Sequence, residues 1–435
     1  MSEISNKKPE DPYFPLEQKL LQIGKPLLNA LIIAGFHPYV KANKWGEARC
    51  HYHNFALFWA ILNLFLLIIG ETFYTIFVYS PVLEKHTKGF TETFTYGLVT
   101  YSAMVSFLIL KALSIFKYNK HLKFWQLNVR LLAEFSETSP QFDGSSEPMI
   151  SYLDRTRQEI RRSLVFGIFL VVFWLNMTVA RIQMTVGLMD ASSHINALIY
   201  IESFIWNINF SMYFLFGLFL GFYLKIYSIC LRVIAVEMEK IVSAQTRGSF
   251  PLHTNFDLSP RPIFNSSCKL EHITELLEQC LKAYLIVEEL VLSFNRHFDT
   301  ELFLTFVTSF CMIFARTFLV FYVALKYSPT ELIFAVGKTI VYIWQIYHVA
   351  SSCSQLDQQV KEIQYFLHRI ELKGLPTYML TKIDMLALRL TTHPLTISPW
   401  QFFKLDRRLI TTMFASMTTY LVILIQFQVG DKNMP

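Results

Sequence analysis

Seven stretches of this chain are apolar over about twenty residues each, and this feature limits the possible folds more than any other. A helix needs ~20 mostly apolar residues to cross the ~30 Å hydrocarbon layer of a membrane. The chain is also poor in charge, at 17%, whereas a typical soluble protein carries about 25% charged residues. We therefore expect an all-α, polytopic membrane protein. Its predicted spans are Phe55–Tyr79, Phe94–Phe116, Ser163–Leu188, Ala197–Ile229, Leu302–Leu325, Leu332–Ala350 and Leu409–Phe427.

The distribution of positive charge predicts how these seven transmembrane helices are oriented. Segments 1–54, 117–162, 230–301 and 351–408 contain seven, eight, seven and eight Lys and Arg residues, which is 30 of the 39 in the chain. The four segments alternate with the spans, so they lie on one side of the membrane, and loops rich in Lys and Arg stay in the cytoplasm. The expected topology has a cytoplasmic N-terminus and an extracellular C-terminus.

Two heptad patterns in the cytoplasmic segments predict long helices that continue out of the membrane. Apolar residues recur at a/d spacing from Leu270 to Phe294, before the fifth span, and from Leu356 to Ile370, after the sixth. The simplest structure is a pair of helices that bundle in the cytoplasm. Two interpretations are open at this point: the bundle is internal to one chain, or it is an anchor that contacts other subunits.

The last span carries polar residues along one helical face. Thr412, Ser416, Thr419, Ile423 and Gln426 follow one another at spacings of 4, 3, 4 and 3. Polar groups are costly against lipid and usually face a bundle interior or a water-filled path. Uncharged hydroxyls and amides suit a pore for hydrated ions, but small polar residues also serve helix packing, so both uses are open.

The same span resembles the C-terminal signature of insect gustatory receptors. Residues 419–427 read Thr-Tyr, five apolar residues and then Gln-Phe, and the preceding Trp400–Ile410 is similar to the family's aromatic turn with an Asp. Seven spans with an internal N-terminus resemble the family over essentially the whole chain. Leu421 stands where sugar receptors often have an acidic residue, which leaves the fructose-type and bitter-type branches open.

This resemblance implies a ligand-gated, non-selective cation channel in the plasma membrane of sensory neurons. A small tastant, a sugar or a bitter compound, would open a homotetramer, or a heteromer with related receptors, surrounded by membrane lipid and without nucleic acid. A cytoplasmic anchor would hold the subunits together. The last helix would line the pore, with Gln426 and Phe427 at an extracellular gate. The residues implied for pore and gate are Ser416, Thr419, Ile423, Gln426 and Phe427.

The predicted domains follow from the topology and the resemblance together. Residues 1–54 form a cytoplasmic segment, and 55–350 hold the first six spans, the ligand-pocket bundle and cytoplasmic helical extensions that include 268–300. Residues 351–408 form the anchor, and 409–435 form the pore-lining helix with a short extracellular tail.

The resemblance also implies a ligand pocket in the outer halves of the spans before the last. Aromatic faces with a few polar groups suit a small ligand, and ionisable groups inside a membrane are usually functional. Other roles are open: Arg181 as an ion-pair partner of Glu202, Lys338 snorkelling to the interface, and the aromatic residues as an interfacial belt. The predicted ligand contacts are Tyr96, Trp174, Thr178, Arg181, Trp206, Arg316, Lys338 and Tyr342.

Catalysis has little support in the sequence. Cys50, His51 and His53 form one short group, whereas zinc sites usually require two separated pairs of ligands. Phosphate-binding loops and hydrolase motifs are absent from the sequence, so we expect no enzyme activity, cofactor or metal. Two other functions remain as alternatives: a metabotropic seven-helix receptor, which the charge distribution opposes, and a secondary transporter, which requires matched broken helices.

Overall fold

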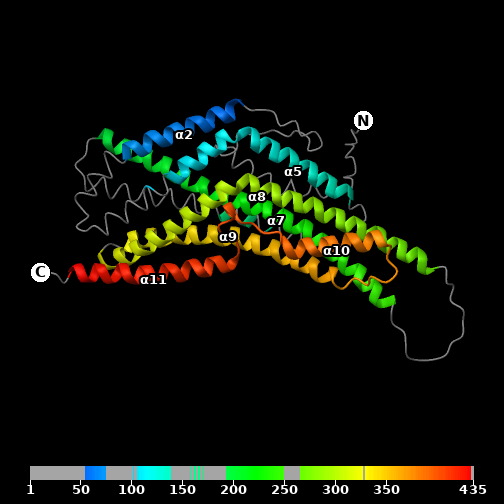
Figure 1. Cartoon of the computed structure of the whole chain (residues 1–435). Coiled ribbons are helices and arrows are strands. Elements are labelled where there is room, and N and C mark those ends of the chain that lie inside the picture. Colours follow the sequence, from blue (N-terminus) through cyan, green and yellow to red (C-terminus); the bar gives the residue numbers. More distant parts are fainter. Residues whose placement is uncertain are drawn as a thin grey trace, which may run out of the picture.

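The computed structural model describes residues 54–74, 105–138, 193–248, 265–326 and 329–432, together with a few single residues between these ranges. Every regular element in these ranges is helical, and the helices run along one long axis (Figure 1). An apolar helix over Val105–Phe116 precedes the second of the longer elements. The elements are α2 (Asn54–Tyr74), α5 (Tyr118–Thr138), α7 (Ser193–Gly248), α8 (Asn265–Lys326), α9 (Pro329–Leu367), α10 (Thr377–Thr392), the short 3-10 helix η2 (Pro399–Gln401) and α11 (Arg407–Lys432).

Two helices are far longer than a membrane is thick. α7 has 56 residues and α8 has 62, so at ~1.5 Å per residue each is about 80–90 Å long. α8 continues without a break from its heptad segment into the predicted fifth span, as expected. The sequence did not predict that α7 continues beyond Ile229, the end of the predicted fourth span, as far as Gly248.

Both heptad patterns pack inside the chain. Leu277, Val287 and Val291 of α8 are fully buried, and Leu356 and Ile363 of α9 are equally inaccessible. This confirms the first interpretation, in which the a/d residues form an intramolecular bundle of α7, α8 and α9. Any contact with another subunit must therefore use other faces of these helices.

Within the described residues, two helices are long and apolar enough to cross a membrane by composition alone. They cover Tyr213–Gln245 and Leu270–Phe321 and thus include parts of the predicted fourth and fifth spans; the shorter apolar helix Val105–Phe116 lies in the predicted second span. Most of the predicted third span, Ser163–Leu188, lies outside the described residues. The full number of spans and the orientation of the termini stay predictions.

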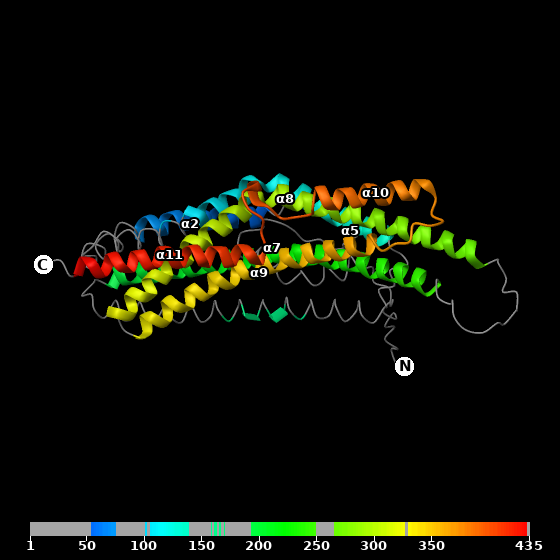
Figure 2. The same cartoon turned by 60° about the horizontal axis from the view of Figure 1, so that its bottom comes forward.

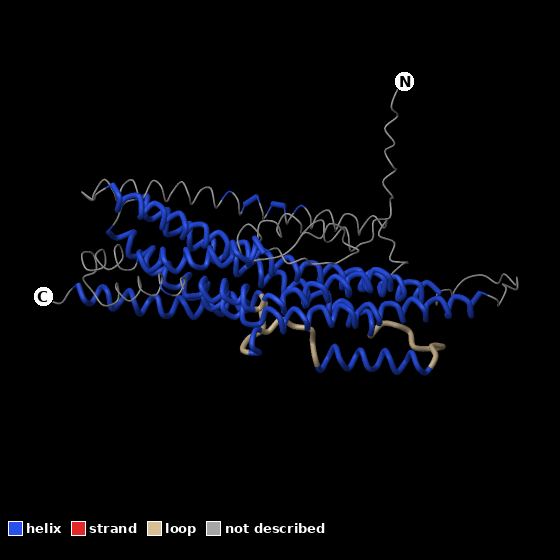
Figure 3. Tube along the Cα trace, turned by 90° about the horizontal axis from the view of Figure 1, so that it is seen from above, coloured by secondary structure: helices blue, strands red, loops and turns tan. Residues whose placement is uncertain are grey.

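The last two long elements lie at the surface of the bundle. α10 runs along the outside, with its flanking loops in tan (Figure 3), and buries Met379, Ile383, Leu386 and Leu390 against α8 and α9. α11 lies next to α9 in the half of the molecule that ends at the C-terminus (Figure 2). The segment between them includes η2, and α11 continues from it to the C-terminal end along the edge of the bundle (Figure 1).

Candidate functional site

Polar side chains are buried together between the Val105–Phe116 helix, α7 and α8. The hydroxyl of Tyr213 donates to the carbonyl oxygen of Thr305 at 2.8 Å and lies 3.0 Å from the hydroxyl of Ser309. The hydroxyls of Ser106 and Thr308 are 2.5 Å apart. Hydroxyl groups are costly to bury unless they form hydrogen bonds, and these contacts hold three helices in one register.

α9 joins this cluster through Gln345 and Tyr342. The Gln345 side-chain amide donates to the carbonyl oxygen of Tyr213 at 3.2 Å. The rings of Tyr213 and Tyr342 have their centroids 6.1 Å apart, within the range of aromatic contact. Polar groups of four helices therefore meet at one level of the bundle.

Three of the predicted ligand residues are buried on α8 and α9, and Tyr342 is part of this cluster. Arg316 and Lys338 are only 9% and 6% exposed, and Tyr342 is fully buried. Arg316 is close enough to act electrostatically on the phenol of Tyr342, and Lys338 precedes Tyr342 by one helical turn on α9. Because Lys338 is inside the bundle, the alternative in which it snorkels to the membrane interface is wrong.

The other predicted ligand residues cannot be compared with the structure. Tyr96, Trp174, Thr178 and Arg181 lie outside the described residues. Trp206 belongs to α7, but its side chain is also outside the described part. Among the predicted ligand residues, the structure therefore places Arg316 of α8 close to Tyr342 of α9, and the pocket itself stays a prediction.

Several members of the polar cluster were not among the predicted site residues. Thr305, Thr308 and Ser309 are spaced by three and four residues along α8, so a search for polar helical faces in the fifth span would have found them. Tyr213 has no comparable signal, because its partners are distant in sequence and depend on how α7 and α8 pack.

Two glycines allow α7 and α9 to approach closely at the level of the cluster. A Cβ atom added at Gly217 would lie 2.6 Å from Nε2 of Gln345, and one added at Gly221 would overlap the imidazole of His348. Small residues four apart on a membrane helix commonly form such a contact surface. The side chains of Gln345 and His348 occupy the space that α7 leaves.

The polar stripe of α11 faces away from its own subunit. Met417 and Leu421 are buried on one side of the helix, and Met413 is partly buried against the core on the same side. Thr412, Ser416, Thr419, Ile423 and Gln426 are exposed on roughly the opposite side. Phe427 lies in α11, but its side chain is outside the described part.

The hydroxyls of this stripe have partners on their own helix. Thr412, Ser416 and Thr419 donate to the carbonyl oxygens of Arg408, Thr412 and Ala415 at 3.1, 3.0 and 3.4 Å. Such bonds satisfy the donor of each hydroxyl and leave the oxygen able to accept from water. The stripe is therefore compatible with either water or another helix.

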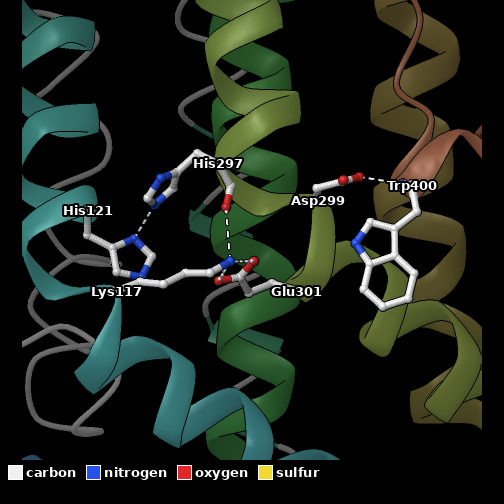
Figure 4. A network of polar contacts seen from close by, with 6 residues as sticks. All are labelled: Lys117, His121, His297, Asp299, Glu301 and Trp400. Carbon is white, nitrogen blue, oxygen red and sulfur yellow. Dashed lines mark hydrogen bonds and ion pairs between the residues drawn. The ribbon is translucent and has the colours of Figure 1, made fainter.

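The turn before α11 has an unusual backbone and is fixed to α8. Trp400 and Gln401 have positive φ angles of 48° and 60°, in the left-handed region that disfavours side chains. The backbone N–H of Trp400 donates to the carboxylate of Asp299 (Figure 4). The indole of Trp400 also stacks on Phe303, with ring centroids 4.3 Å apart, and Asn295 donates to the carbonyl of Thr396 at 3.0 Å.

The first residues around α11 are fixed to α9. The backbone N–H and the guanidinium of Arg407 donate to the hydroxyls of Ser354 and Ser351 at 3.0 and 2.8 Å. Lys404 pairs with Asp357 at 2.8 Å. Burial acts to raise the pKa of Asp357, but hydrogen bonds from Lys361 and Lys404 outweigh it and lower the pKa. α9 thus connects the buried polar cluster directly to the start of α11.

The described part of the chain contains no candidate metal site. Within it, no three His, Cys, Asp or Glu side chains are placed to hold a metal ion. Cys50, His51 and His53 lie outside the described residues.

Comparisons with known proteins agree with this architecture. A family model described as 7tm Chemosensory receptor matches residues 24–430. The fold is similar to that of the insect olfactory receptor OR5 from Machilis hrabei, with a TM-score of 0.65, 15% sequence identity, and coverage of 94% of this chain and 99% of that chain. The structure of that receptor in complex with eugenol matches with a TM-score of 0.61, 14% identity and the same coverage. Curated protein sequences gave no significant match.

Proposed function

The chain belongs to the 7tm chemosensory receptor family, and from this membership we propose that it is a gustatory receptor. It acts as a ligand-gated, non-selective cation channel that a small tastant opens in the plasma membrane of sensory neurons. The observation that carries the proposal is the position of the polar stripe on α11, exposed on the side opposite Met417 and Leu421. An exposed polar face in a membrane requires water or other polar helices beside it.

A symmetric assembly supplies that environment. When identical subunits surround an axis, the same face of each α11 is brought to that axis. In the proposed homotetramer, Ser416, Thr419 and Gln426 line the pore, Ile423 adds an apolar ring, and Phe427 closes the outer end by excluding water. The gate roles of Gln426 and Phe427 rest on the resemblance of 419–427 to gustatory receptors.

The outer face of α10 is the proposed contact between subunits in the cytoplasm. Tyr378, Met385 and Leu388 are each more than half exposed, although the opposite face of the helix is packed against α8 and α9. Exposed apolar residues grouped on one helix commonly mark a protein–protein contact. This surface belongs to the segment 351–408, the predicted anchor, and would serve equally in a heteromer with related subunits.

The proposed ligand site is the pocket for which Arg316, Lys338 and Tyr342 form one side. Two cationic groups and aromatic rings suit a small molecule with hydroxyl or carbonyl oxygens. The similar Machilis hrabei receptor is known in complex with eugenol, so small aromatic compounds belong in the same test as sugars and bitter compounds. A ligand opens the channel only if it binds the open arrangement more tightly than the closed one. The contacts of Arg407 with α9 would couple a movement of α9 at the ligand site to α11.

Recording from cells that express this chain alone tests the proposal. We expect cation currents when sugars, bitter compounds or small aromatic compounds are applied, and these currents should persist when G-protein signalling is blocked. Loss of the response under that block would instead indicate a metabotropic receptor. Substrate uptake without ligand-gated current would indicate a transporter.

A further inference from the structure

A second polar cluster lies where α5 packs against α8 and contains none of the residues proposed for the pocket or the pore (Figure 4). Ring nitrogen Nδ1 of His121 on α5 and Nε2 of His297 on α8 face each other in a hydrogen bond, although the two residues are 176 positions apart. His121 is buried and His297 is partly buried. Both lie in segments that the charge distribution assigns to the cytoplasm.

An ion pair adjoins the two imidazoles. The ammonium of Lys117 is 2.9 Å from both carboxylate oxygens of Glu301 and 3.5 Å from the carbonyl oxygen of His297. Burial raises the pKa of the Glu301 carboxyl, and the charge and hydrogen bonds of Lys117 oppose that effect. His297 and Glu301 are one helical turn apart on α8, so the pair and the histidines form one connected group.

Aromatic rings also contact the histidines. The ring of Phe124 stacks on His297 at a centroid distance of 4.6 Å, and the ring of Phe298 has its centroid 4.7 Å from that of His297 and 5.8 Å from that of His121. From α7 the titratable neighbour is the buried phenol of Tyr223, which contacts Phe124 and Phe298. The charged groups beside the histidine pair include Lys117 and Glu301, and Asp299 acts on Glu301 from the same turn of α8.

The hydrogen bond between the two imidazoles depends on their protonation state. One nitrogen must donate and the other must accept, so the facing nitrogens share a single proton. A proton added to a ring nitrogen on the far side leaves this bond intact, whereas protonation of both rings makes both facing nitrogens donors and places two cations side by side, close to the ammonium of Lys117. Histidine is the side chain that ordinarily gains a proton between about pH 5 and 8.

We propose that the His121–His297 pair is a proton-binding site that makes this receptor sensitive to cytoplasmic pH. At neutral pH the shared proton holds α5 against α8. When the cytoplasm becomes acidic enough to protonate both rings, this bond breaks and α8 is released from α5. This role is separate from the proposed opening by a tastant. Of the two measurements that test it, the current recording rests on the proposed channel function, and the thermal unfolding does not.

The same turn of α8 holds the segment that leads into α11. Asp299 lies between His297 and Glu301 in sequence and accepts the hydrogen bond from Trp400 on another side of the helix (Figure 4). Phe303, one turn later, stacks on Trp400. A displacement of α8 relative to α5 therefore reaches the turn before the proposed pore helix through direct contacts.

The test compares the wild-type chain with His121→Gln/His297→Gln while the cytoplasmic solution is changed from pH 7.4 to about pH 6, across the ordinary histidine range. Glutamine keeps one donor and one acceptor on each side but does not titrate. We expect the half-maximal ligand concentration of the wild-type channel to shift by at least about fivefold, the lower end of typical allosteric coupling, and that of the double variant to stay unchanged. His272→Gln, an exposed histidine on the same helix, is the matched control and should behave as wild type.

Equal shifts in the wild type and the double variant, or no shift in either, would overturn the proposal. If no ligand gives a current, the thermal unfolding of the purified chain decides. Over the same pH range, the melting temperature of the wild type should fall more than that of the double variant, because only the wild type loses the imidazole bond. Equal losses would overturn the proton site, whereas a missing current by itself counts against the channel function only.

Discussion

The carboxylate of Asp299 accepts a hydrogen bond from the backbone N–H of Trp400, and this contact joins α8 to the turn from which α11 begins. Trp400 and Gln401 both have positive φ angles, a conformation that costs most side chains ~1–2 kcal/mol per residue. Strained backbone persists where the surrounding structure holds it and is frequent at switch regions. The Asp299 contact and the stacking of Trp400 on Phe303 are two of the interactions that hold this turn.

Asp299→Ala should weaken the turn and change the gating of the channel. Removing a charged acceptor from a backbone N–H costs about 1.5–3 kcal/mol, and the strained turn loses one of the contacts that hold it. We expect a lower melting temperature and an altered half-maximal ligand concentration. Asp384→Ala, at an exposed aspartate on α10, is the control; if both variants behave alike, the Asp299 contact has no special role.

Gln401→Gly should make the protein more stable. Glycine adopts positive φ without strain, which relieves ~1–2 kcal/mol, whereas its extra freedom in the unfolded chain costs only about 0.4–1 kcal/mol. The side chain of Gln401 is exposed, so little packing is lost. Gln358→Gly, at an exposed position inside α9, should instead lower the free energy of unfolding by ~1 kcal/mol. Thermal unfolding of both variants checks the contrast, and a loss of stability in Gln401→Gly would contradict it.

Local periodicity predicts a large part of this fold. The heptad spacing from Leu270 to Phe294 predicted both a helix and its buried face, because residues three and four apart share one side of a helix. The stripe from Thr412 to Gln426 was likewise found at the surface of α11. The extension of α7 to Gly248 was missed, since the prediction used the end of the apolar run as the end of the helix.

Contacts between distant segments could not be predicted from this one sequence. The bond between His121 and His297 and that between Tyr213 and Thr305 each depend on which helices are neighbours and on their axial register. The conformation of Trp400 was also unexpected, because tryptophan has no preference for positive φ. Lys338 was predicted to contact the ligand, with snorkelling to the membrane interface as the alternative. Its burial within the bundle depends on how α9 packs, which this one sequence does not show.

Gly221→Ala should force α7 and α9 apart. The added methyl group would overlap the rigid ring of His348, and overpacking of this kind costs about 1–3 kcal/mol. His348→Ala in the same chain should recover much of that loss, because it removes the obstructing ring. A double-mutant cycle on thermal unfolding measures this coupling; purely additive losses would show that Gly221 and His348 do not share the space.

Asp357 should contribute to an acid-dependent loss of stability. Its pKa in the folded protein is lowered below the ordinary value, because the bonds from Lys361 and Lys404 outweigh burial. A lowered pKa stabilises the folded state above the unfolded carboxyl pKa of about 4, and that stabilisation is lost as the pH falls through the folded-state value. Between pH 6 and about pH 3, Asp357→Asn should therefore lose less melting temperature than the wild type. Asp384→Asn, whose carboxylate is exposed on α10, should follow the wild type, and identical profiles for all three proteins would contradict the prediction.

The pore assignment makes a directional prediction about α11. Cysteines placed at Ser416 and Thr419 lie on the exposed stripe, whereas a cysteine at Met417 lies on the buried side of the same helix. If the stripe lines a water-filled path, a charged thiol reagent should reduce the currents of the first two variants, and ligand should speed the reaction because the thiolate is then more accessible to water. Met417→Cys should react slowly or not at all. Gln426→Ala should alter gating or ion permeation while surface expression is retained, as expected for a residue at the gate. If Ser416→Cys and Thr419→Cys are as unreactive as Met417→Cys in open channels, the polar stripe serves helix packing, and the conducting path must be sought elsewhere in the bundle.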